Sequence, residues 1–233
     1  MRQRDDHSDD PTPRRRFLGR LAGGVAGLAA LGASPERLMG AVSRAPVDRA
    51  QFDDDWMDEL NAKHRTVFDM SAHKNGKPLG QAMNYLDAWR DAFKVPERDV
   101  NLVIGIHGEG LPAVLTDATW ARFKIGEQYE LMDAGMKAPA VRNVFSTANA
   151  AAGGLITPDQ AVENLQKRGV RFLICMNTIA GATRKLSAAG LGSPAEIRPA
   201  LISGLLPGVI AVPSMVVTLT QLQERGLRYV KIA

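Results

Sequence analysis

Beyond residue 63 the chain alternates between short, nearly continuous apolar runs and longer segments with apolar residues at helical spacing. The short runs predict strands, because a continuous apolar stretch between turn signals is typical of a strand that is buried on both faces. The predicted strands lie at residues 65–71, 100–107, 141–146, 170–175, 209–212 and 227–232.

The longer segments predict helices between these strands. Thr157 and Pro158 suit the start of a helix that ends before Gly169, since Thr is a favoured N-cap, Pro fits the first turn and Gly is common just past the end. The other predicted helices lie at residues 78–93, near 125–132, around 188–190 and at 215–225. Alternation of strands and helices predicts an α/β fold, a three-layer α/β/α sandwich around a mostly parallel sheet.

The first 45 residues differ in composition from the rest. A polar stretch of mixed charge precedes a short Ala/Gly-rich apolar segment at residues 21–33, as in a signal peptide. Between the polar stretch and the apolar segment lie four residues that resemble the twin-arginine export signal: Arg14, Arg15, Phe17 and Leu18. The apolar segment is shorter than the roughly 20 residues that a membrane span needs. We therefore expect export to the periplasm through the twin-arginine translocase, with a basic tail as the alternative and membrane anchoring if the leader is not cleaved.

We divide the chain into a signal peptide at residues 1–45, a polar lead-in at 46–62 and one domain at 63–233. The formal net charge of the whole chain is +4. The leader holds eight arginines and five acidic residues, so the remaining residues account for about +1 of that charge. Phosphate binding needs a basic patch or stripe, and we therefore expect no nucleic-acid partner.

The single cysteine, Cys175, follows the apolar run of residues 170–174 and precedes a predicted helix. One thiol cannot form an internal disulfide or hold an iron–sulfur cluster. A thiol between a strand end and a helix start lies near free backbone N–H groups and the positive end of the helix dipole, which stabilise a thiolate. Arg184 and Lys185 follow in the same predicted helix and can add positive charge. The other interpretation is that Cys175 is a small apolar core residue.

A second candidate segment is His107-Gly108-Glu109-Gly110, at the end of the predicted strand 100–107. His107 can act as a base near a thiol, with Glu109 orienting it, and the glycines allow a close approach of a ligand or loop. The other interpretation is a partly buried histidine whose hydrogen bonds are satisfied by the backbone. The segment lacks a dinucleotide-binding fingerprint, and no histidine pair has metal-ligand spacing. We expect neither a cofactor nor a metal.

These segments and the C-terminal end of the chain together resemble the DsrE/DsrF-like family. The similarity covers roughly residues 63–233 and rests on the segments 107–111, 165–178 and 219–232. The resemblance implies a five-stranded α/β/α sandwich that assembles into oligomers. In the sulfur-relay members of that family a cysteine after the fourth strand carries a persulfide, a role that corresponds to Cys175 here. A long stretch at residues 111–140 departs from the compact family pattern, and the relay members are cytoplasmic.

The sequence leaves three functional hypotheses. The first is a periplasmic carrier or transferase of sulfane sulfur, with Cys175 as nucleophile, His107 as base, and Asn177, Thr178, Gly108 and Glu109 around the bound sulfur. It implies a homo-oligomer and a protein that donates or accepts sulfur. The second is a non-catalytic, exported oligomeric binding or accessory protein in which Cys175 is simply buried. The third is a small-molecule enzyme whose site no motif marks.

Overall fold

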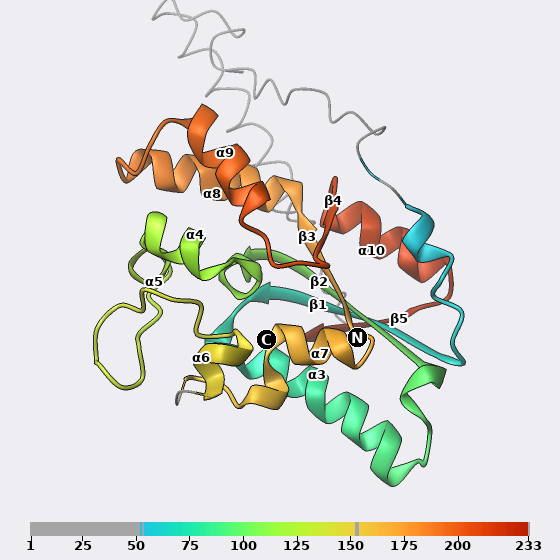
Figure 1. Cartoon of the computed structure of the whole chain (residues 1–233). Helices are drawn as coiled ribbons and strands as arrows, with labels where there is room; N and C mark the ends of the chain where they lie inside the picture. The colour runs from blue at the N-terminus through green and yellow to red at the C-terminus, as the bar shows by residue number, and fades with distance from the viewer. Residues whose placement is uncertain (1–51, 53, 152–153, 233) are drawn as a thin grey trace, which may run out of the picture. The chain divides into compact units, whose positions relative to one another are not determined.

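A five-stranded, all-parallel sheet forms the centre of the domain (Figure 1). The computed structural model describes residues 52, 54–151 and 154–232. The strand order is β4-β3-β2-β1-β5. The strands are β1 (His64–Ala72), β2 (Val100–Glu109), β3 (Arg171–Cys175), β4 (Ile210–Val212) and β5 (Arg228–Ile232). The prediction of an α/β sandwich around a five-stranded sheet is confirmed.

Helices connect successive strands, as parallel pairing requires. They are α3 (Lys77–Asp87, continued by a π-helical turn at Ala88–Ala92), α4 (Asp117–Arg122), α5 (Ile125–Gln128), α6 (Thr147–Ala151), α7 (Val162–Lys167), α8 (Met176–Ala188), α9 (Pro194–Ser203) and α10 (Met215–Glu224). The first three crossovers step across the sheet in one direction, from β1 to β4, and the fourth returns to β5 beside β1. Because such crossovers are right-handed, the reversal puts α10 on the face opposite to the earlier helices.

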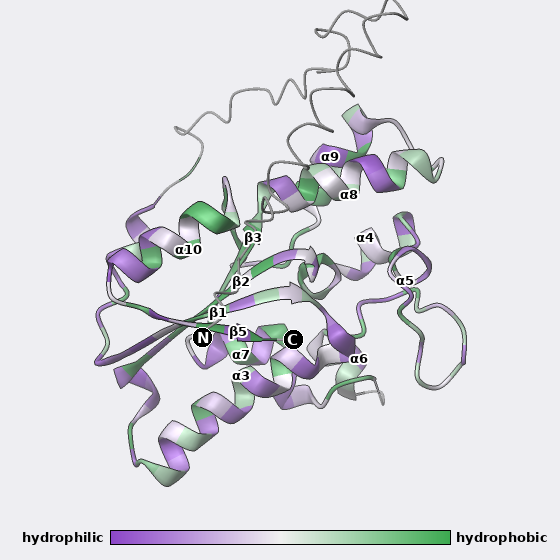
Figure 2. Ribbon diagram, turned by 180° about the vertical axis from the view of Figure 1, so that it is seen from behind, coloured by the Kyte–Doolittle hydropathy of each residue, from purple (hydrophilic) through white to green (hydrophobic). Residues whose placement is uncertain are grey.

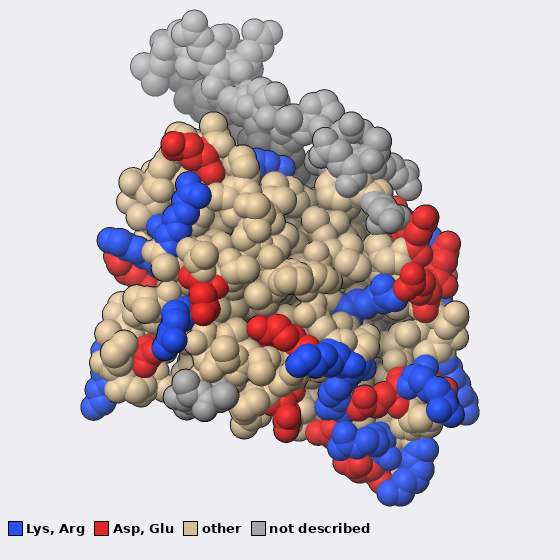
Figure 3. All heavy atoms as spheres, in the orientation of Figure 1, with Lys and Arg blue, Asp and Glu red and all other residues tan. Residues whose placement is uncertain are grey.

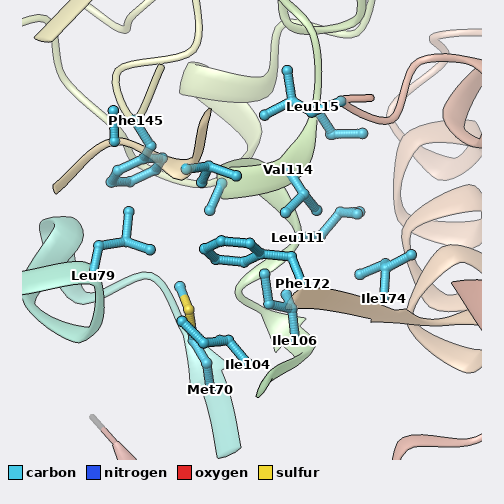
Figure 4. Close-up of a cluster of buried hydrophobic side chains, with 14 of the residues drawn as sticks. Met70, Leu79, Ile104, Ile106, Leu111, Val114, Leu115, Phe145, Phe172 and Ile174 are labelled. Carbon is cyan, nitrogen blue, oxygen red and sulfur yellow. The ribbon is translucent and has the colours of Figure 1, made fainter. Parts of the chain in front are cut away.

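Two hydrophobic cores follow from this arrangement. The larger core packs alternate residues of β1, β2 and β3 against α3, α4, α7, α8 and α9, and includes Phe68, Ile104 and Phe172. Figure 4 shows the centre of this core, where Phe172 lies between Leu79 of α3 and the chain around Leu111 and Val114. The smaller core packs the intervening residues of the same strands against α10. Figure 2 shows the apolar character of the strands and of the first turn of α10.

Part of the predicted polar lead-in packs on the domain. Trp56 and Met57, in a 3-10 turn at Asp55–Met57, are buried together with Leu60 in the smaller core. The ring nitrogen of Trp56 has no hydrogen-bond partner in the described structure. Residues 54–60 therefore extend the cover that α10 provides over this face of the sheet.

The predicted strand at residues 141–146 is wrong. Asn143 is fully buried in this segment, and its side chain holds the local backbone in a loop. Its Nδ2 donates to the carbonyl oxygens of Ala113 (3.3 Å) and Leu115 (2.7 Å), and its Oδ1 accepts from the Phe145 N–H (2.8 Å). Side-chain hydrogen bonds of this kind compete with a strand ladder. As a result Cys175 ends the third strand of the sheet, not the fourth.

Two predicted helices are shorter than expected. The segment near residues 125–132 forms only α5, because Lys124 and Glu130 have positive φ angles of 47° and 54° on either side of it. The segment from Thr157 begins with a 3-10 turn at Pro158–Gln160 and becomes extended at Ala161 (ψ 146°) before α7 starts. Thr157 and Gln160 form a capping box, so the predicted start is confirmed. Gly169 follows α7 with φ 86°.

Charged side chains of both signs are mixed on the surface (Figure 3). On the face shown, Lys and Arg alternate with Asp and Glu and form no continuous basic stripe, and the centre of the face is uncharged. An ion-pair network joins Arg168 to Asp87 (2.9 Å) and to Glu97 (2.5 Å). It ties the end of α7 to the end of α3 and to the segment that enters β2.

Candidate functional site

A cleft of about 480 Å³ lies at the carboxyl ends of β2 and β3, between the starts of α8 and α10. This is the edge of a parallel sheet at which ligands usually bind. The cleft brings together all six residues that the sequence singles out for chemistry: His107, Gly108, Glu109, Cys175, Asn177 and Thr178. Segments some 70 residues apart in the chain therefore form one wall.

Cys175 is the last residue of β3 and the N-cap residue of α8. It is buried, with 4% of its surface exposed, and it contributes to the wall of the cleft. Its Sγ accepts a hydrogen bond from the backbone N–H of Met215 at 3.3 Å. Met215 is the first residue of α10, so the sulfur lies at the N-termini of two helices. The positive ends of both helix dipoles stabilise negative charge at this position.

The chain turns at Gly108, near the end of β2, where the pairing with β1 shifts register and the backbone contacts α8. Gly108 has φ 55°, and a Cβ atom there would lie 2.9 Å from the carbonyl oxygen of Ser71. Any larger residue would therefore push this turn away from β1. The Gly108 N–H donates to Oγ1 of Thr178 at 3.0 Å. This hydrogen bond ties the turn to the first turn of α8, next to Cys175.

The partner of His107 is Asp69, not Glu109 as the sequence suggests. The Nε2 of His107 lies 2.6 Å from Oδ1 of Asp69 on β1. The second carboxylate oxygen, Oδ2, accepts a hydrogen bond from the hydroxyl of Tyr229 on β5 at 2.7 Å. Asp69 is buried (8% exposed), and this hydrogen bond raises the pKa of Tyr229 above its ordinary value.

Glu109 faces Lys185 of α8 instead. Their side chains are 3.9 Å apart, and the ammonium group of Lys185 lies 4.0 Å from the centre of the Tyr129 ring. Burial raises the pKa of Tyr129. Arg184, which the sequence pairs with Lys185, is exposed and lies outside the set of cleft-lining residues. The cation that reaches the cleft is therefore Lys185.

A second cleft of about 530 Å³ shares Glu109, Tyr129 and Lys185 with the first. It continues along the carboxyl ends of the strands past His73, which follows β1. Burial lowers the pKa of His73 from its ordinary value, so this imidazole is neutral at physiological pH. The two clefts together form a groove across the carboxyl ends of β1, β2 and β3.

Sequence reasoning missed Asp69, Tyr229 and Met215 as parts of this site. A signal was present for Asp69, because a carboxylate within an apolar strand is costly unless it has hydrogen-bond partners. Tyr229 and Met215 carry no such signal, since an aromatic residue in a strand and an apolar residue in a helix are both ordinary. Their place in the site depends on the fold, which returns β5 to the side of β1.

Within the described ranges, no three His, Cys, Asp or Glu side chains gather in a way that could hold a metal ion. None of the helices in the part of the chain that the structure describes is long and apolar enough to cross a membrane. The predicted export signal, including Arg14, Arg15, Phe17 and Leu18, lies outside the described residues.

Comparison with known proteins assigns no family to this chain. No protein-family model matches this sequence, and no curated protein matches it. Among solved structures, a protein of unknown function from Methanobacterium thermoautotrophicum is similar in structure; the match covers 72% of this chain and 99% of that protein, with 18% sequence identity and a TM-score of 0.40.

Proposed function

We propose that this protein carries sulfane sulfur as a persulfide on Cys175. The observation that supports the proposal most is the position of the sulfur atom: Sγ accepts the Met215 N–H at 3.3 Å and Cys175 caps α8. Two helix N-termini stabilise the thiolate, and the thiolate is the nucleophile in sulfur exchange. The resemblance to the DsrE/DsrF-like family gives the same residue this role.

The proposed step transfers one sulfur atom without a net oxidant. The Cys175 thiolate attacks the terminal sulfur of a persulfide donor, R–S–SH, and a new S–S bond forms on Cys175. The S–S bond of the donor breaks, and its electron pair leaves on the donor sulfur as R–S⁻, which then takes up a proton. Delivery to an acceptor thiol is the same reaction in reverse.

The cleft offers groups for the bound persulfide. Asn177 lines it beside the free N–H groups in the first turn of α8, and these donors suit a terminal sulfur that carries negative charge. The Thr178 hydroxyl accepts from Gly108 and so fixes the turn that bears Glu109. Glu109 and Lys185 also line the cleft and offer charged groups to a donor or acceptor.

We further propose that the domain works in the periplasm, as a homo-oligomer that exchanges sulfur with a partner protein. The twin-arginine pattern of the leader supports this location. The large apolar side chains that remain exposed on α10 and β5 support an assembly: Val216, Val217, Tyr229 and Val230.

The burial of Cys175 favours a second candidate, a non-catalytic exported accessory or binding protein. With 4% of its surface exposed, Cys175 can serve as a small apolar residue of the core around α10. In that case the cysteine contributes to stability alone, and no reagent reaches it while the domain is folded.

One experiment separates the two candidates. The folded full-length chain is incubated with a small-molecule persulfide, and its intact mass is measured before and after reduction. The proposal requires a gain of one sulfur atom that reduction removes, and no gain in Cys175→Ser, which lacks the only thiol. A chain that gains sulfur only after denaturation is an accessory protein, and the sulfur-carrier proposal is then wrong.

A further inference from the structure

Asp69, His107 and Tyr229 form a chain of hydrogen bonds across three neighbouring strands. Asp69 accepts from His107 at 2.6 Å and from Tyr229 at 2.7 Å, through its two different oxygens. All three residues lie on the face of the sheet that α10 covers. Asp69 and His107 are an even number of positions from Val67 and Val103, which belong to the smaller core, and Tyr229 pairs with Val67 on the neighbouring strand. The carboxylate is thereby held by two donors.

This arrangement fixes which nitrogen of His107 is free. A carboxylate accepts hydrogen bonds and does not donate them, so Nε2 carries the hydrogen that points at Asp69. In the neutral ring Nδ1 then has no hydrogen and is a base. The side chain of His107 is 34% exposed and forms part of the cleft wall. The imidazole can therefore exchange a proton with a molecule in the cleft.

The same wall contains Cys175. The strands β2 and β3 pair in register up to Ile106 and Ile174, so His107 and Cys175 are the next residues of the two neighbouring strands. They lie on one face of the sheet, since both alternate with residues of the larger core. In the described structure the hydrogen bond to Sγ comes from Met215, and none joins Sγ to His107.

We infer that His107 is the acid–base catalyst of sulfur transfer to Cys175 and that Asp69 and Tyr229 are its positioning residues. This inference rests on the proposed function. As the S–S bond of the donor breaks, protonated His107 gives its proton to the departing donor sulfur, so that the donor leaves as a thiol, R–SH. In the reverse direction neutral His107 removes that proton from the acceptor thiol. Atoms and charge balance in both directions.

The other ionisable groups around His107 do not take its place. Glu109, Tyr129 and Lys185 line the same cleft. Glu109 and Lys185 face each other at 3.9 Å, and burial raises the pKa of Tyr129, which keeps its hydroxyl protonated. The part of α10 that lines the cleft offers Ser214, Met215 and Val216, none of which titrates near neutral pH. The acid–base group at the sulfur is therefore His107.

The test measures the rate at which the folded full-length chain gains sulfur from a small-molecule persulfide, over a range of pH. His107→Ala should lower the rate by roughly 10²-fold, which is the lower end of the usual contribution of general acid–base catalysis. Imidazole added to His107→Ala should restore part of that rate, because removal of the His107 side chain leaves space for free imidazole in the cleft. The matched control is His64→Ala: His64 lies at the opposite end of β1 and stacks on Trp89 at 4.0 Å, and its loss should leave the rate unchanged.

The roles of Asp69 and Tyr229 need a measurement that a loss of stability alone would not change, and the pH dependence of the rate is such a measurement. Asp69→Asn keeps the shape of the side chain but replaces a carboxylate, which only accepts, with an amide that also donates. The nitrogen of His107 that faces position 69 is then no longer fixed as the donor, so the pH–rate profile should change. Tyr229→Phe should change the rate less, since it leaves the contact between Asp69 and His107 in place. Circular dichroism and thermal melting establish that each variant is folded before its rate is compared.

The outcomes distinguish this inference from the proposed function. If the wild-type chain gains no sulfur, both are wrong. If it gains sulfur at rates that are equal in His107→Ala and His64→Ala, the carrier role stands and the role of His107 is wrong. If Asp69→Asn slows transfer without moving the pH–rate profile, Asp69 is a structural residue and not a positioning one.

Discussion

Gly105 of β2 lies directly against Met215, the first residue of α10. A Cβ atom at position 105 would lie 2.5 Å from the sulfur of Met215 and 3.4 Å from its methyl group. The absence of a side chain at Gly105 therefore sets how closely the start of α10 approaches the sheet. The same residue, Met215, donates its backbone N–H to Cys175, so this packing contact positions the donor to the thiol.

Gly105→Ala should destabilise the domain and disturb the surroundings of Cys175. Met215 is buried at 2% exposure and has little room to move, so the extra methyl overpacks the smaller core at a cost of about 1–3 kcal/mol. Chemical denaturation measures the loss. Gly181→Ala is the matched control: position 181 lies within α8 with its nearest neighbour, Arg184, 4.0 Å away, and should gain about 0.5–1 kcal/mol because alanine favours a helix. Equal stability of Gly105→Ala and the wild type would contradict this account.

The strands of this fold could be predicted from sequence because buried parallel strands are nearly continuous apolar runs. Five of the six predicted strands form, and Cys175 and His107 lie at the strand ends where the pattern puts them. The sixth, at residues 141–146, does not form, because the buried amide of Asn143 satisfies the backbone there. The pattern of apolar residues within a short segment cannot reveal that Asn143 bonds to the carbonyl groups of Ala113 and Leu115, which lie 30 and 28 residues away along the chain.

Part of the composition of the cleft was predictable, whereas the hydrogen bonds within it were not. The residues His107 and Cys175 occur in segments with evident turn and strand signals. Asp69 precedes His107 by 38 residues and Tyr229 follows Asp69 by 160. Their contacts depend on the sheet order, in which β1 lies between β2 and β5. Glu109 is nearer to His107 in sequence, but it follows the turn at Gly108 and faces Lys185.

Asn143→Ala should strongly destabilise the domain. The amide is fully buried, and its loss leaves the Leu115 carbonyl and the Phe145 N–H without their partner. Each unsatisfied buried group costs about 1–3 kcal/mol, so a total loss of roughly 2–6 kcal/mol is expected for the two groups in a denaturant titration. Asn164→Ala is the control, because its hydrogen bond to the Pro158 carbonyl is exposed and its loss should cost less than about 1 kcal/mol. Similar losses in the two variants would show that the loop is not held by Asn143.

Replacement of Arg14 and Arg15 by lysine should block export. The twin-arginine translocase recognises an arginine pair in the leaders that it exports, and lysine keeps the charge but not the planar, multiply donating guanidinium group. Fractionation of cells that produce each form measures the result: the wild-type chain should be found in the periplasm and the variant in the cytoplasm. Arg2→Lys with Arg4→Lys is the matched control and should be exported normally. Export of the Arg14/Arg15 variant at the wild-type level would show that this pair is not the signal.

Tyr229 should ionise at higher pH than an ordinary tyrosine, and Asp69→Asn should reverse much of that difference. The hydrogen bond to Asp69 is the main cause of the raised pKa, because it requires a protonated hydroxyl and places a carboxylate beside it. The contribution of this bond to stability is therefore complete below pH 10.0, the ordinary pKa of tyrosine, and is lost as the pH rises through the higher value in the folded state. The ultraviolet absorbance of tyrosinate, taken as the difference between the wild type and Tyr229→Phe, follows this residue alone among the three tyrosines. If the pH at which Tyr229 ionises is the same in Asp69→Asn as in the wild type, the hydroxyl of Tyr229 is not hydrogen-bonded to Asp69 in solution. The proposed hydrogen-bond chain would then join only Asp69 and His107.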